Sequence, residues 1–491
     1  MTVLPAPAAG PPSRTAVRRA GDHYQDLVTW CCVLRALLPG STVTQLEIEV
    51  DGAGNVDDVV QRHAAPPHRY SQLKYAVRAE GPINTGYLLT RQNNGTSLLE
   101  KFYASWTFLG AGPVAPAMEL VTNRAIDPSD ELLRLCDGRS DLLLPAARLA
   151  PLRSGAGKLV TEWAAHLQVD RDDLLAMLEH LVFRTGRTVS AERERAEALM
   201  LAAGLRADET ALRLGTATVA EWVRQGRRVL PVGELADEVE ALGLRIAEPR
   251  AVLLLQAIDR DPHPDDATVA LDWVDLYDGD EPAVRRSPKN PEAWHQMSTE
   301  LDAATSQLRA SGHRDVLVRG AMRLGTFFAV GARLAQVTGI NVHYARHGTM
   351  WSSTAPRTHT EPLRSDYLPL DQGDDLAIAI AITIDPTEAV ARHLRQTGTP
   401  VRGLLTLRPA EGPHDQAVTG PGHGVTLAQE LRNAVRGELE RRPAARVHLF
   451  QAGPGGLAFL TGHRWNRVAP TLLYEDLGPG LGYVHAFTIA A

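Results

Sequence analysis

The stretch RVHLFQAGPGGLAFLTGHRWNRVAPTLLYED, residues 446–476, alternates between two kinds of hydrophobic pattern. Its first part, RVHLFQA, predicts a short strand, GGLAFLTGHRW predicts a helix, and PTLLYE predicts a second strand. Parallel strands need a helical crossover between them, so this succession is typical of a parallel α/β sheet. The stretch therefore predicts a doubly wound α/β fold for the C-terminal half of the chain.

The same alternation extends upstream to about residue 250. HRDVLVRG, INVHYA, DLAIAIAIT and VRGLLTLRP predict strands, and AMRLGTFFAVGARLAQVTG, PTEAVARHLRQTG and VTLAQELRNAVRGELERR predict helices. DLAIAIAIT is a near-continuous apolar run, as expected for a strand that is covered on both faces. Because the pattern repeats about twice, residues 250–491 are predicted to hold two Rossmann-like halves, related by pattern only.

Length and composition limit the remaining possibilities. The chain has 491 residues, 44% of them hydrophobic, and no run of 18 apolar residues, so we expect two to four domains and no membrane span. A net charge of −7 is unlike that of a protein that coats DNA. The three cysteines fit neither a disulfide framework nor a zinc site, and a reducing cytoplasm is expected. Residues 1–20 lack the apolar core of a signal peptide and predict a disordered lead-in.

Two further regions precede the doubly wound half. Residues 21–127 predict a helix, a meander of short strands, further helices and another strand. Residues 128–245 are helical in pattern almost throughout and predict a helical connector without a catalytic cluster. Within the connector, SGAGKLV (154–160) resembles a phosphate-binding loop, but the spacing and the residue after Lys158 are wrong for one.

The stretch NVDDVVQRHAAPPHRYSQLKYAV, residues 55–77, brings acidic, amide and ammonium groups to neighbouring strands. Side chains two apart on a strand share a face, so Gln72 and Lys74 point together, whereas only one of Asp57 and Asp58 can join them. Glu49, near the end of the preceding strand, is a further candidate. Metal-dependent phosphodiester cleavage needs oxygen ligands for Mg²⁺ and a cation beside the phosphate or the attacking water. The chain has only four lysines against 47 arginines, which draws attention to Lys74.

This arrangement resembles the PD-(D/E)xK nuclease fold in its Mrr-like QxK variant, in which glutamine replaces the second acid. GDHYQ at 21–25 is similar to the opening helix of that family. The resemblance implies that Asp58, directly before an apolar pair, is the principal metal ligand, with Asp57 as the alternative. It also implies that Gln72 supplies an amide oxygen or orients water, and that Lys74 acts as the base or stabilises the phosphate.

The C-terminal half resembles SAVED domains, which are similar to two fused CARF-like Rossmann units. The resemblance is carried by HLFQAGP and LLYE within residues 446–476, and by DVLVRGAMRLGTFFAVGARLAQVTGINVHYA upstream. SAVED domains bind cyclic oligonucleotides in bacterial cyclic-oligonucleotide-based anti-phage signalling (CBASS). A QxK nuclease joined to a SAVED domain is the architecture of that system's DNA-degrading effectors, which implies Mg²⁺ as cofactor, double-stranded DNA as substrate and a homo-oligomer induced by a cyclic tri- or larger oligonucleotide.

Candidate ligand contacts lie where the predicted strands end, because doubly wound sheets bind ligands beyond the carboxyl ends of their strands. Tyr344 and Trp351 would stack on bases. The other candidates, at strand ends, are Arg319, Arg346, Thr383, Arg408, Gln451, Ala452 and Pro454.

Two other interpretations stay open at this stage. The N-terminal region is alternatively a non-catalytic module that binds DNA or protein beside a cyclic-nucleotide sensor. The whole chain is alternatively a restriction endonuclease that needs no messenger and cuts in Mg²⁺ alone.

Overall fold

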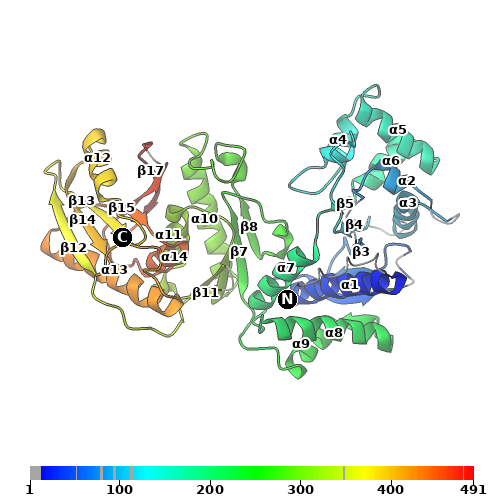
Figure 1. Ribbon diagram of the computed structural model, residues 1–491, viewed down its shortest axis with the longest axis horizontal. Coiled ribbons are helices and arrows are strands. Elements are labelled where there is room, and N and C mark those ends of the chain that lie inside the picture. The colour runs from blue at the N-terminus through cyan, green and yellow to red at the C-terminus, as the bar shows by residue number, and fades with distance from the viewer. Residues whose placement is uncertain are drawn as a thin grey trace, which may run out of the picture. The chain divides into compact units, whose positions relative to one another are not determined.

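The computed structural model describes residues 13–50, 52, 54–77, 81–91, 95–110, 115–346, 349–478 and 480–491, and the side chain of Arg346 is not among the described parts. The chain divides into two compact units, an N-terminal unit (Met1–Glu248) and a C-terminal unit (Pro249–Ala491) (Figure 1). Each unit has its own buried apolar cores. The mixed α/β architecture predicted from the sequence is confirmed.

The described part of the N-terminal unit contains a sheet of six strands in the order β5-β4-β3-β2-β1-β6. Strands β3, β4 and β5 are parallel, and the other neighbours are antiparallel. The strands are β1 (Val43–Ile48), β2 (Val59–His63), β3 (Arg69–Lys74), β4 (Ala117–Thr122), β5 (Leu181–Arg184) and β6 (Val229–Pro231). The helices are α1 (Arg14–Ala36), α2 (Thr85–Leu89), α3 (Leu98–Leu109), η2 (Leu133–Leu135), α4 (Leu144–Leu149), α5 (Gly155–Leu167), α6 (Arg171–Leu178), α7 (Val189–Ala202), α8 (Glu209–Gln225) and α9 (Val232–Ala241).

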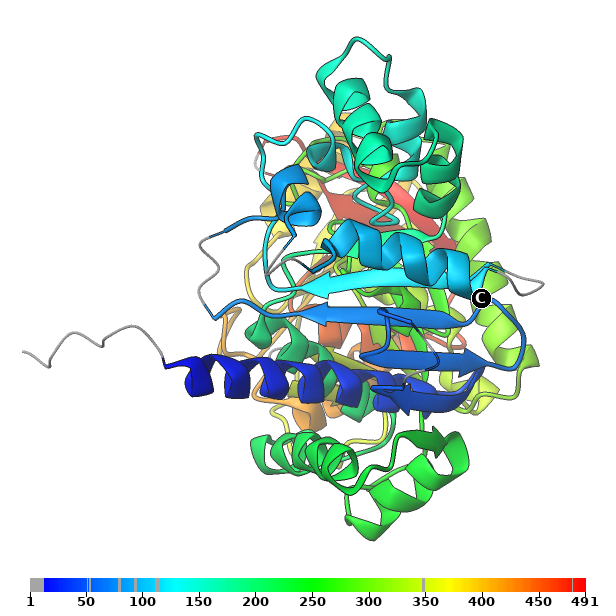
Figure 2. The same cartoon turned by 90° about the vertical axis from the view of Figure 1, so that its right-hand side faces the viewer.

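Helix α1 lies alongside this sheet (Figure 2). It begins after Ser13, whose hydroxyl oxygen accepts a hydrogen bond from the backbone N–H of Ala16 at 3.2 Å. This cap corrects the expectation of a disordered lead-in over 1–20, because the chain is helical from Arg14; residues 1–12 lie outside the described residues. The ring of Trp30 is fully buried against Gly215 of α8, where a Cβ would collide with it.

Residues 128–245 are not a separate connector, which corrects the second expectation about this half. They supply β5 and β6, which pair with β4 and β1 at the two edges of the sheet, and their helices α7 and α8 pack on α1. Both strands are very short, and their few apolar residues fit the spacing of a helix as well as that of a strand. Long-range pairing with β4 and β1 therefore decides the conformation of these segments.

The C-terminal unit contains two sheets, ordered β11-β10-β9-β7-β8 and β12-β14-β13-β15-β16-β17 over the residues that the structure describes. The strands are β7 (Ala251–Gln256), β8 (Val269–Asp272), β9 (Asp315–Arg319), β10 (Asn341–Arg346), β11 (Thr349–Ser352), β12 (Arg364–Pro369), β13 (Asp375–Ala381), β14 (Val401–Arg408), β15 (Val447–Ala452), β16 (Thr471–Asp476) and β17 (Tyr483–Ile489). The helices are η3 (Pro264–Asp266), η4 (Val274–Leu276), α10 (Ala293–Ala310), α11 (Leu324–Arg333), η5 (Gln336–Thr338), α12 (Thr387–Thr397), α13 (Pro421–Arg441) and α14 (Gly455–His463).

Five strands have the same topology in both sheets, and β12 adds a sixth, antiparallel strand beside β14 in the second sheet. Strands β8-β7-β9-β10-β11 correspond one by one to β14-β13-β15-β16-β17, with four parallel strands and an antiparallel edge in each case. The sequence repeats as well: residues 315–334 and 446–465 align without a gap and are identical at six of 20 positions. The two predicted Rossmann-like halves are thus confirmed, and they are related by sequence as well as by pattern.

Matching hydrogen bonds support this internal repeat. The carbonyl oxygen of Ala321 accepts from the N–H groups of Ala257 and Ile258 at 3.1 and 3.0 Å. The carbonyl oxygen of Ala452, the residue equivalent to Ala321, accepts from Ile382 and Thr383 at 2.8 and 3.2 Å. Each half therefore joins its first strand to its third strand in the same way.

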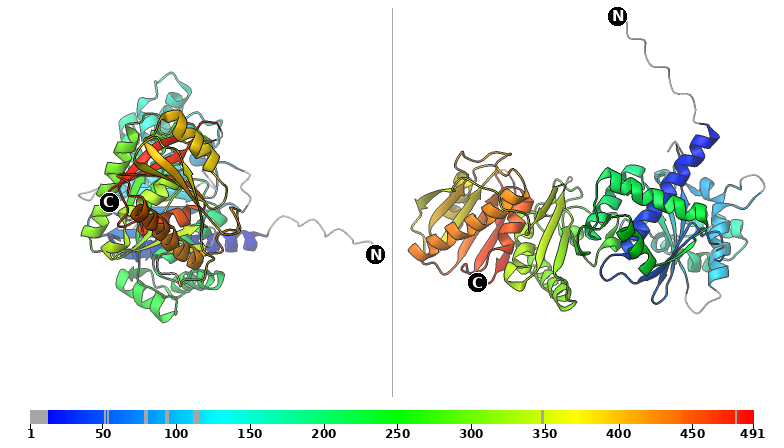
Figure 3. Two further views of the ribbon diagram at one scale, coloured as in Figure 1. Left: turned by 90° about the vertical axis from the view of Figure 1, so that its left-hand side faces the viewer. Right: turned by 90° about the horizontal axis from the view of Figure 1, so that it is seen from below.

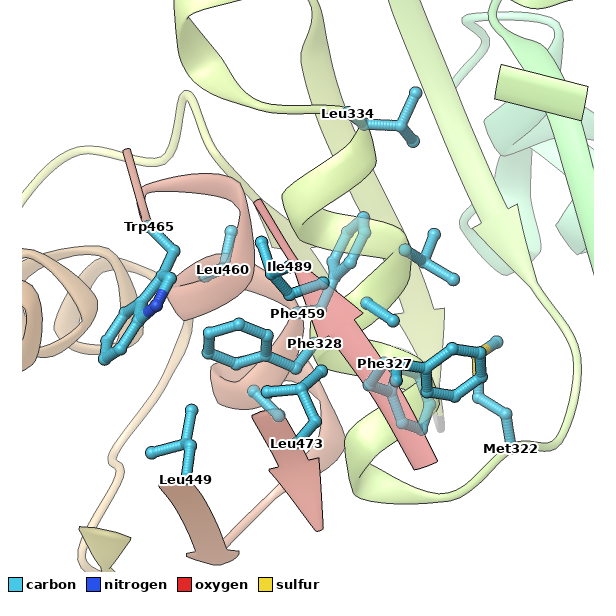
Figure 4. Packing of buried hydrophobic residues seen from close by; sticks show 14 of the residues in the cluster. Met322, Phe327, Phe328, Leu334, Leu449, Phe459, Leu460, Trp465, Leu473 and Ile489 are labelled. Carbon is cyan, nitrogen blue, oxygen red and sulfur yellow. The ribbon is translucent and has the colours of Figure 1, made fainter. Parts of the chain in front are cut away.

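Helices α11 and α14 pack against each other between the two sheets, and we call their contact the seam (Figures 1 and 4). A Cβ at Gly331 would collide with the carbonyl oxygen of Phe459, and a Cβ at Gly462 would collide with that of Phe328. Gly331 and Gly462 are equivalent in the repeat, as are Phe328 and Phe459. Glycine at these two positions lets the helix backbones approach closely, while the phenylalanines fill the space beside them.

Strand β13 is buried at every position, which confirms the prediction for DLAIAIAIT. Alternate residues face opposite sides: Ala377 and Ala379 pack with α12, whereas Ile378 and Ile380 join the larger core with α13. Helix α13 runs along the sheet when the molecule is viewed from below (Figure 3). Among the described residues, no helix has both the length and the apolar character needed to cross a bilayer.

Candidate active site and candidate ligand site

Strands β2 and β3 bring the predicted catalytic residues of the N-terminal unit together. Val59 pairs with Ser71, so Asp58 lies beside Gln72, one residue further along. The Oδ2 atom of Asp58 accepts hydrogen bonds from the amide Nε2 of Gln72 and from the backbone N–H of Leu73, the latter at 2.6 Å. Lys74 is the last residue of β3, on the same face as Gln72.

Burial raises the pKa of the Asp58 carboxyl group above its ordinary value. The ammonium group of Lys74 is the strongest influence that lowers this pKa, followed by the hydrogen bonds from Leu73 and Gln72. The charge of Asp57 raises it slightly. Asp58 is therefore the acid at the centre of this group, with Lys74 close enough to act on its charge.

Asp58 opens into a hollow of about 610 Å³. Glu49, Asp22 and Asp26 line the same hollow. Four acidic residues therefore line it: Asp22 and Asp26 lie on α1, Glu49 follows β1, and Asp58 precedes β2. Burial and the charges of Asp22 and Glu49 raise the pKa of Asp26 to about 7. The cations at the hollow are Arg18 and Arg224.

Sequence reasoning missed Asp22 and Asp26. They lie four residues apart on α1, and residues at that spacing share one helix face. An acidic pair on one face of a helix whose other face is fully buried was the available signal. Their place in the hollow depends on the packing of α1 beside β1, which the sequence pattern does not specify.

Glu49 sits in an uncommon backbone conformation, with φ of 50°. Its N–H donates to the carbonyl oxygen of Asp58 at 3.3 Å, and its own carbonyl oxygen accepts from Nη1 of Arg228 at 2.7 Å. These bonds hold the turn after β1 against the start of β2. Glu49 is thereby placed at the hollow, as expected from its position near the end of β1.

The donor set at Asp58 suits Mg²⁺. The carboxylate of Asp58 and the amide oxygen of Gln72 are hard oxygen donors, and Mg²⁺ is commonly held by one or two carboxylates and several waters. Across the described ranges no three His, Cys, Asp or Glu side chains are grouped closely enough to hold a metal by themselves. The residues therefore fit a site that relies on few protein ligands, and magnesium stays a prediction.

The candidate ligand site of the C-terminal unit lies between β13 and β15. From β13 the chain crosses to β14 on one side and then returns to β15 on the other, which makes this the switch point of the sheet. Gln451, Ala452 and Pro454 line a small hollow of about 10 Å³ here, with Leu324 of α11 beside them. Thr383 is joined to the same place by its N–H bond to Ala452.

Helix α14 begins at this switch point after Pro454, with no side-chain cap. Two glycines, Gly455 and Gly456, form its first turn, and Gly453 precedes the cap. The N-terminus of a helix carries partial positive charge and free N–H groups, which favour phosphate. The predicted residues 451–454 thus lie at a helix start.

The N-terminus of α11, the equivalent helix, is already occupied by a carboxylate. Oε1 of Glu475 accepts a hydrogen bond from the N–H of Thr326 at 3.2 Å, and Glu475 is only 3% exposed. Burial raises the pKa of Glu475 to about 7, against the opposing effects of Thr326, Arg323 and Gly325. In the repeat, the strand pairing places Arg346 where Glu475 would be, because Val342 pairs with Val316 as Thr471 pairs with Val447.

Two predicted cations at strand ends are already paired. Nη2 of Arg319 donates to Oδ2 of Asp261 at 2.7 Å. Arg408 donates to Asp366 and, at 3.1 Å, to Asp385. The backbone of Arg346 ends β10, and its side chain lies outside the described residues.

The two predicted stacking residues are engaged in packing, and their role in stacking on bases stays a prediction. Tyr344 is 5% exposed, and its ring makes an edge-on contact with Phe327 at 4.8 Å between ring centres. The half-buried ring of Trp351 lies against Gly424 and Gly456, where a Cβ would collide with it. Glycines of α13 and α14 leave room for the ring of Trp351, whereas the ring of Tyr344 packs against Phe327 and Phe459.

Comparison with known proteins gives three findings. The family model described as "SMODS-associated and fused to various effectors sensor domain" (SAVED) matches residues 297–489. CD-NTase-associated protein 4 of Enterobacter hormaechei subsp. hoffmannii (strain UCI 50) is 22% identical over 487 residues, which cover 93% of this chain and 95% of that protein. The Acinetobacter baumannii Cap4 SAVED/CARF-domain containing receptor, solved with the cyclic trinucleotide 2'3'3'-cAAA, aligns with 99% of this chain and 100% of that chain at 13% identity and a TM-score of 0.48.

A second solved structure is similar to the same extent. The Moraxella osloensis Cap4 SAVED/CARF-domain containing receptor aligns with 96% of this chain and 100% of that chain, at 13% identity and a TM-score of 0.44. The family match covers most of the repeated sheets, including the seam and the start of α14. Residues 297–489 of the C-terminal unit therefore match the SAVED sensor-domain model.

Proposed function

We propose that this chain is a CBASS effector: a cyclic oligonucleotide binds the C-terminal unit and thereby activates Mg²⁺-dependent cleavage of double-stranded DNA by the N-terminal unit. The observation that carries the proposal is the grouping of Asp58, Gln72 and Lys74 at strands β2 and β3, with Asp58 also lining an acidic hollow, in a chain whose residues 297–489 match the SAVED model. The similarity to a protein named for its association with a CD-NTase supports the same system.

In the proposed reaction, Asp58 and Gln72 supply oxygen ligands for Mg²⁺, and Lys74 positions or deprotonates the attacking water or stabilises charge on the phosphate. Bound Mg²⁺ would neutralise phosphate charge and lower the pKa of a water molecule. The hydrogen bonds from Gln72 and Leu73 fix the orientation of the Asp58 carboxylate before any substrate arrives. Glu49 and Asp26 add negative charge at the same hollow, which favours a divalent cation there.

The proposed messenger site is the β13–β15 switch point and the start of α14. A phosphate of the ligand would accept from the N–H groups at Gly455 and Gly456, whereas Glu475 repels a second phosphate at the start of α11. The hollow of about 10 Å³ is far smaller than a nucleotide, so binding must move the residues around it. A ligand that favours this opened form drives the chain toward assembly of a homo-oligomer and activity.

The test is incubation of the protein with plasmid DNA and Mg²⁺, with and without a panel of cyclic di- and trinucleotides. The proposal expects cutting only with one or a few of these messengers. Cutting in Mg²⁺ alone would instead support a messenger-independent restriction enzyme. Messenger binding without any cutting would support a sensor with a non-catalytic N-terminal module.

A further inference from the structure

A protruding turn between α4 and α5 displays two leucines to solvent, and we call residues 148–158 the tip (Figures 1 and 2). Leu149 is 80% exposed and Leu152 is 66% exposed. They are the two most exposed large hydrophobic side chains among the described residues of the N-terminal unit. Two leucines exposed together on one structured turn form a candidate contact surface.

The backbone of the tip is fixed, so the leucines are not exposed because the turn is loose. Nη2 of Arg171 donates to the carbonyl oxygens of Ala147 and Ala150 at 2.9 and 3.1 Å. Both the N–H and the hydroxyl of Ser154 donate to the carbonyl oxygen of Pro151, at 2.9 and 2.7 Å. A Cβ at Gly157 would collide with that same carbonyl group.

The tip also carries cations without acidic partners. Arg148, Arg153 and Lys158 are exposed, and among the described residues none of them makes an ion pair within 4.0 Å. No aspartate or glutamate occurs between Asp141 and Glu162, although the chain as a whole carries a net charge of −7. Glu131 lies against the tip, with its carboxylate over Gly155.

We propose that the tip docks double-stranded DNA, with Arg148, Arg153 and Lys158 on phosphates and Leu149 and Leu152 against the minor groove. This inference rests on the proposed function, because it assigns the surface by which the same substrate is held. Three cations grouped on one turn suit the dense phosphate charge of a DNA duplex, which carries one negative charge per roughly 1.7 Å. Apolar side chains between cations are the means by which proteins contact sugars and base edges in the minor groove.

The test measures binding of a fluorescein-labelled 20-base-pair duplex by anisotropy, in EDTA and across a range of salt concentrations, with and without cyclic triadenylate. The triple variant R148Q/R153Q/K158Q is expected to bind roughly 10- to 100-fold more weakly at 0.15 M salt. The slope of log K against log salt is expected to fall by about 2 to 3, or about one per lost phosphate contact. Arg213→Gln, which removes an exposed cation on α8, is the matched control and should change neither quantity.

Two more variants separate the roles of charge and apolar contact. L149S/L152S should weaken binding while leaving the salt slope unchanged. Glu131→Gln should strengthen binding and raise affinity several-fold, an effect of opposite sign that loss of folding cannot produce. Thermal unfolding by circular dichroism, equal in all variants, confirms that the fold is intact.

The outcomes distinguish this inference from the proposed function. A parent protein that binds the duplex through the tip but never cuts it overturns the nuclease and keeps the docking surface. Messenger-dependent cutting that the triple variant retains, with unchanged affinity and salt slope, overturns the docking surface alone. Tip-dependent binding to anionic phosphatidylserine vesicles, with duplex binding unaffected, also overturns it and assigns the tip to a membrane.

Discussion

The hollow at Asp58 and the seam between α11 and α14 are built by opposite means. The hollow gathers four carboxylates: burial and the charges of Asp22 and Glu49 raise the pKa of Asp26, and burial raises the pKa of Asp58. The seam removes side chains altogether, since Gly331 and Gly462 let two helix backbones touch. Buried carboxylates of like charge lower the stability of the fold, whereas a close-packed helix pair transmits small displacements between the sheets on either side.

The largest expected effect is on the hollow. Lys74→Ala should lower messenger-stimulated DNA cleavage by about 10²- to 10⁴-fold, because it removes the cation that acts on Asp58 and on the reacting phosphate. Single-turnover cleavage of a labelled duplex measures this, and calorimetry checks that the messenger is bound as tightly as before. Lys101→Ala, at another lysine of the same unit, is the control. Cleavage equal to that of the parent would remove Lys74 from the site.

The next prediction concerns Glu475, which closes one end of the seam. Its pKa is raised from 4.5 to about 7 in the folded protein, so the stability that it contributes is complete below about pH 4.5 and is lost as the pH rises through 7. Glu475→Gln removes this loss. The variant should gain up to about 3 kcal/mol relative to the parent between pH 5 and pH 8, since each pKa unit corresponds to about 1.4 kcal/mol.

Urea unfolding at both pH values measures the Glu475 effect. Glu388→Gln, at an acid in the first turn of α12, is a control with a charge change at a helix start. A stability difference between Glu475→Gln and the parent that is the same at pH 5 and pH 8 would contradict the prediction.

Substitutions at the seam itself are expected to be somewhat smaller in effect. Gly462→Ala forces a Cβ against the backbone of Phe328, which cannot rotate away, and overpacking of this kind costs about 1–3 kcal/mol. Gly331→Ala should cost a similar amount, because the repeat places it against Phe459 in the same way. Differential scanning calorimetry checks both. Two variants with very different losses would show that the helix pair is less symmetric than the sequence repeat.

The smallest expected effect is a gain of stability, in contrast to the losses expected from glycine substitutions at the seam. Gly437 lies within α13, and no atom stands within 4 Å of the place where its Cβ would be. Gly437→Ala should therefore stabilise the C-terminal unit by about 0.5–1 kcal/mol, through helix propensity alone. The same calorimetric scan measures it, and a loss of stability would mean that the open space around Gly437 is used by another part of the assembly.

The sequence predicted β9, β10, β13, β14, β15 and β16, because these strands are apolar runs separated by clear helices. It did not predict β7, β8, β11, β12 and β17. It failed for β5 and β6, which are four and three residues long and are strands only through pairing with β4 and β1. Gln72 and Lys74 were found because strand alternation is local. Asp22 and Asp26 were missed because their place at the hollow depends on how α1 packs.

For the ligand site, the strand-end rule led correctly to the switch point at residues 451–454, and their role there stays a prediction. The rule also selected Tyr344, because an aromatic residue at a strand end looks the same in sequence whether it faces a ligand or a core. Tyr344 is buried because α11 places Phe327 against its ring, and this packing cannot be deduced from the sequence pattern. Glu475 was overlooked for the same reason, since its partner at Thr326 is 149 residues away.

The repeat has a consequence for how this protein is made. On the ribosome, α11 emerges more than 100 residues before α14. The face of α11 at Gly331 and Phe328, which we call the groove, therefore lacks its packing partner while the intervening strands are synthesised. Contacts between segments so distant in the chain form late in folding. A nascent or truncated chain that stops before Gly455 would expose that bare groove, and such a product is a natural target for chaperones and proteases.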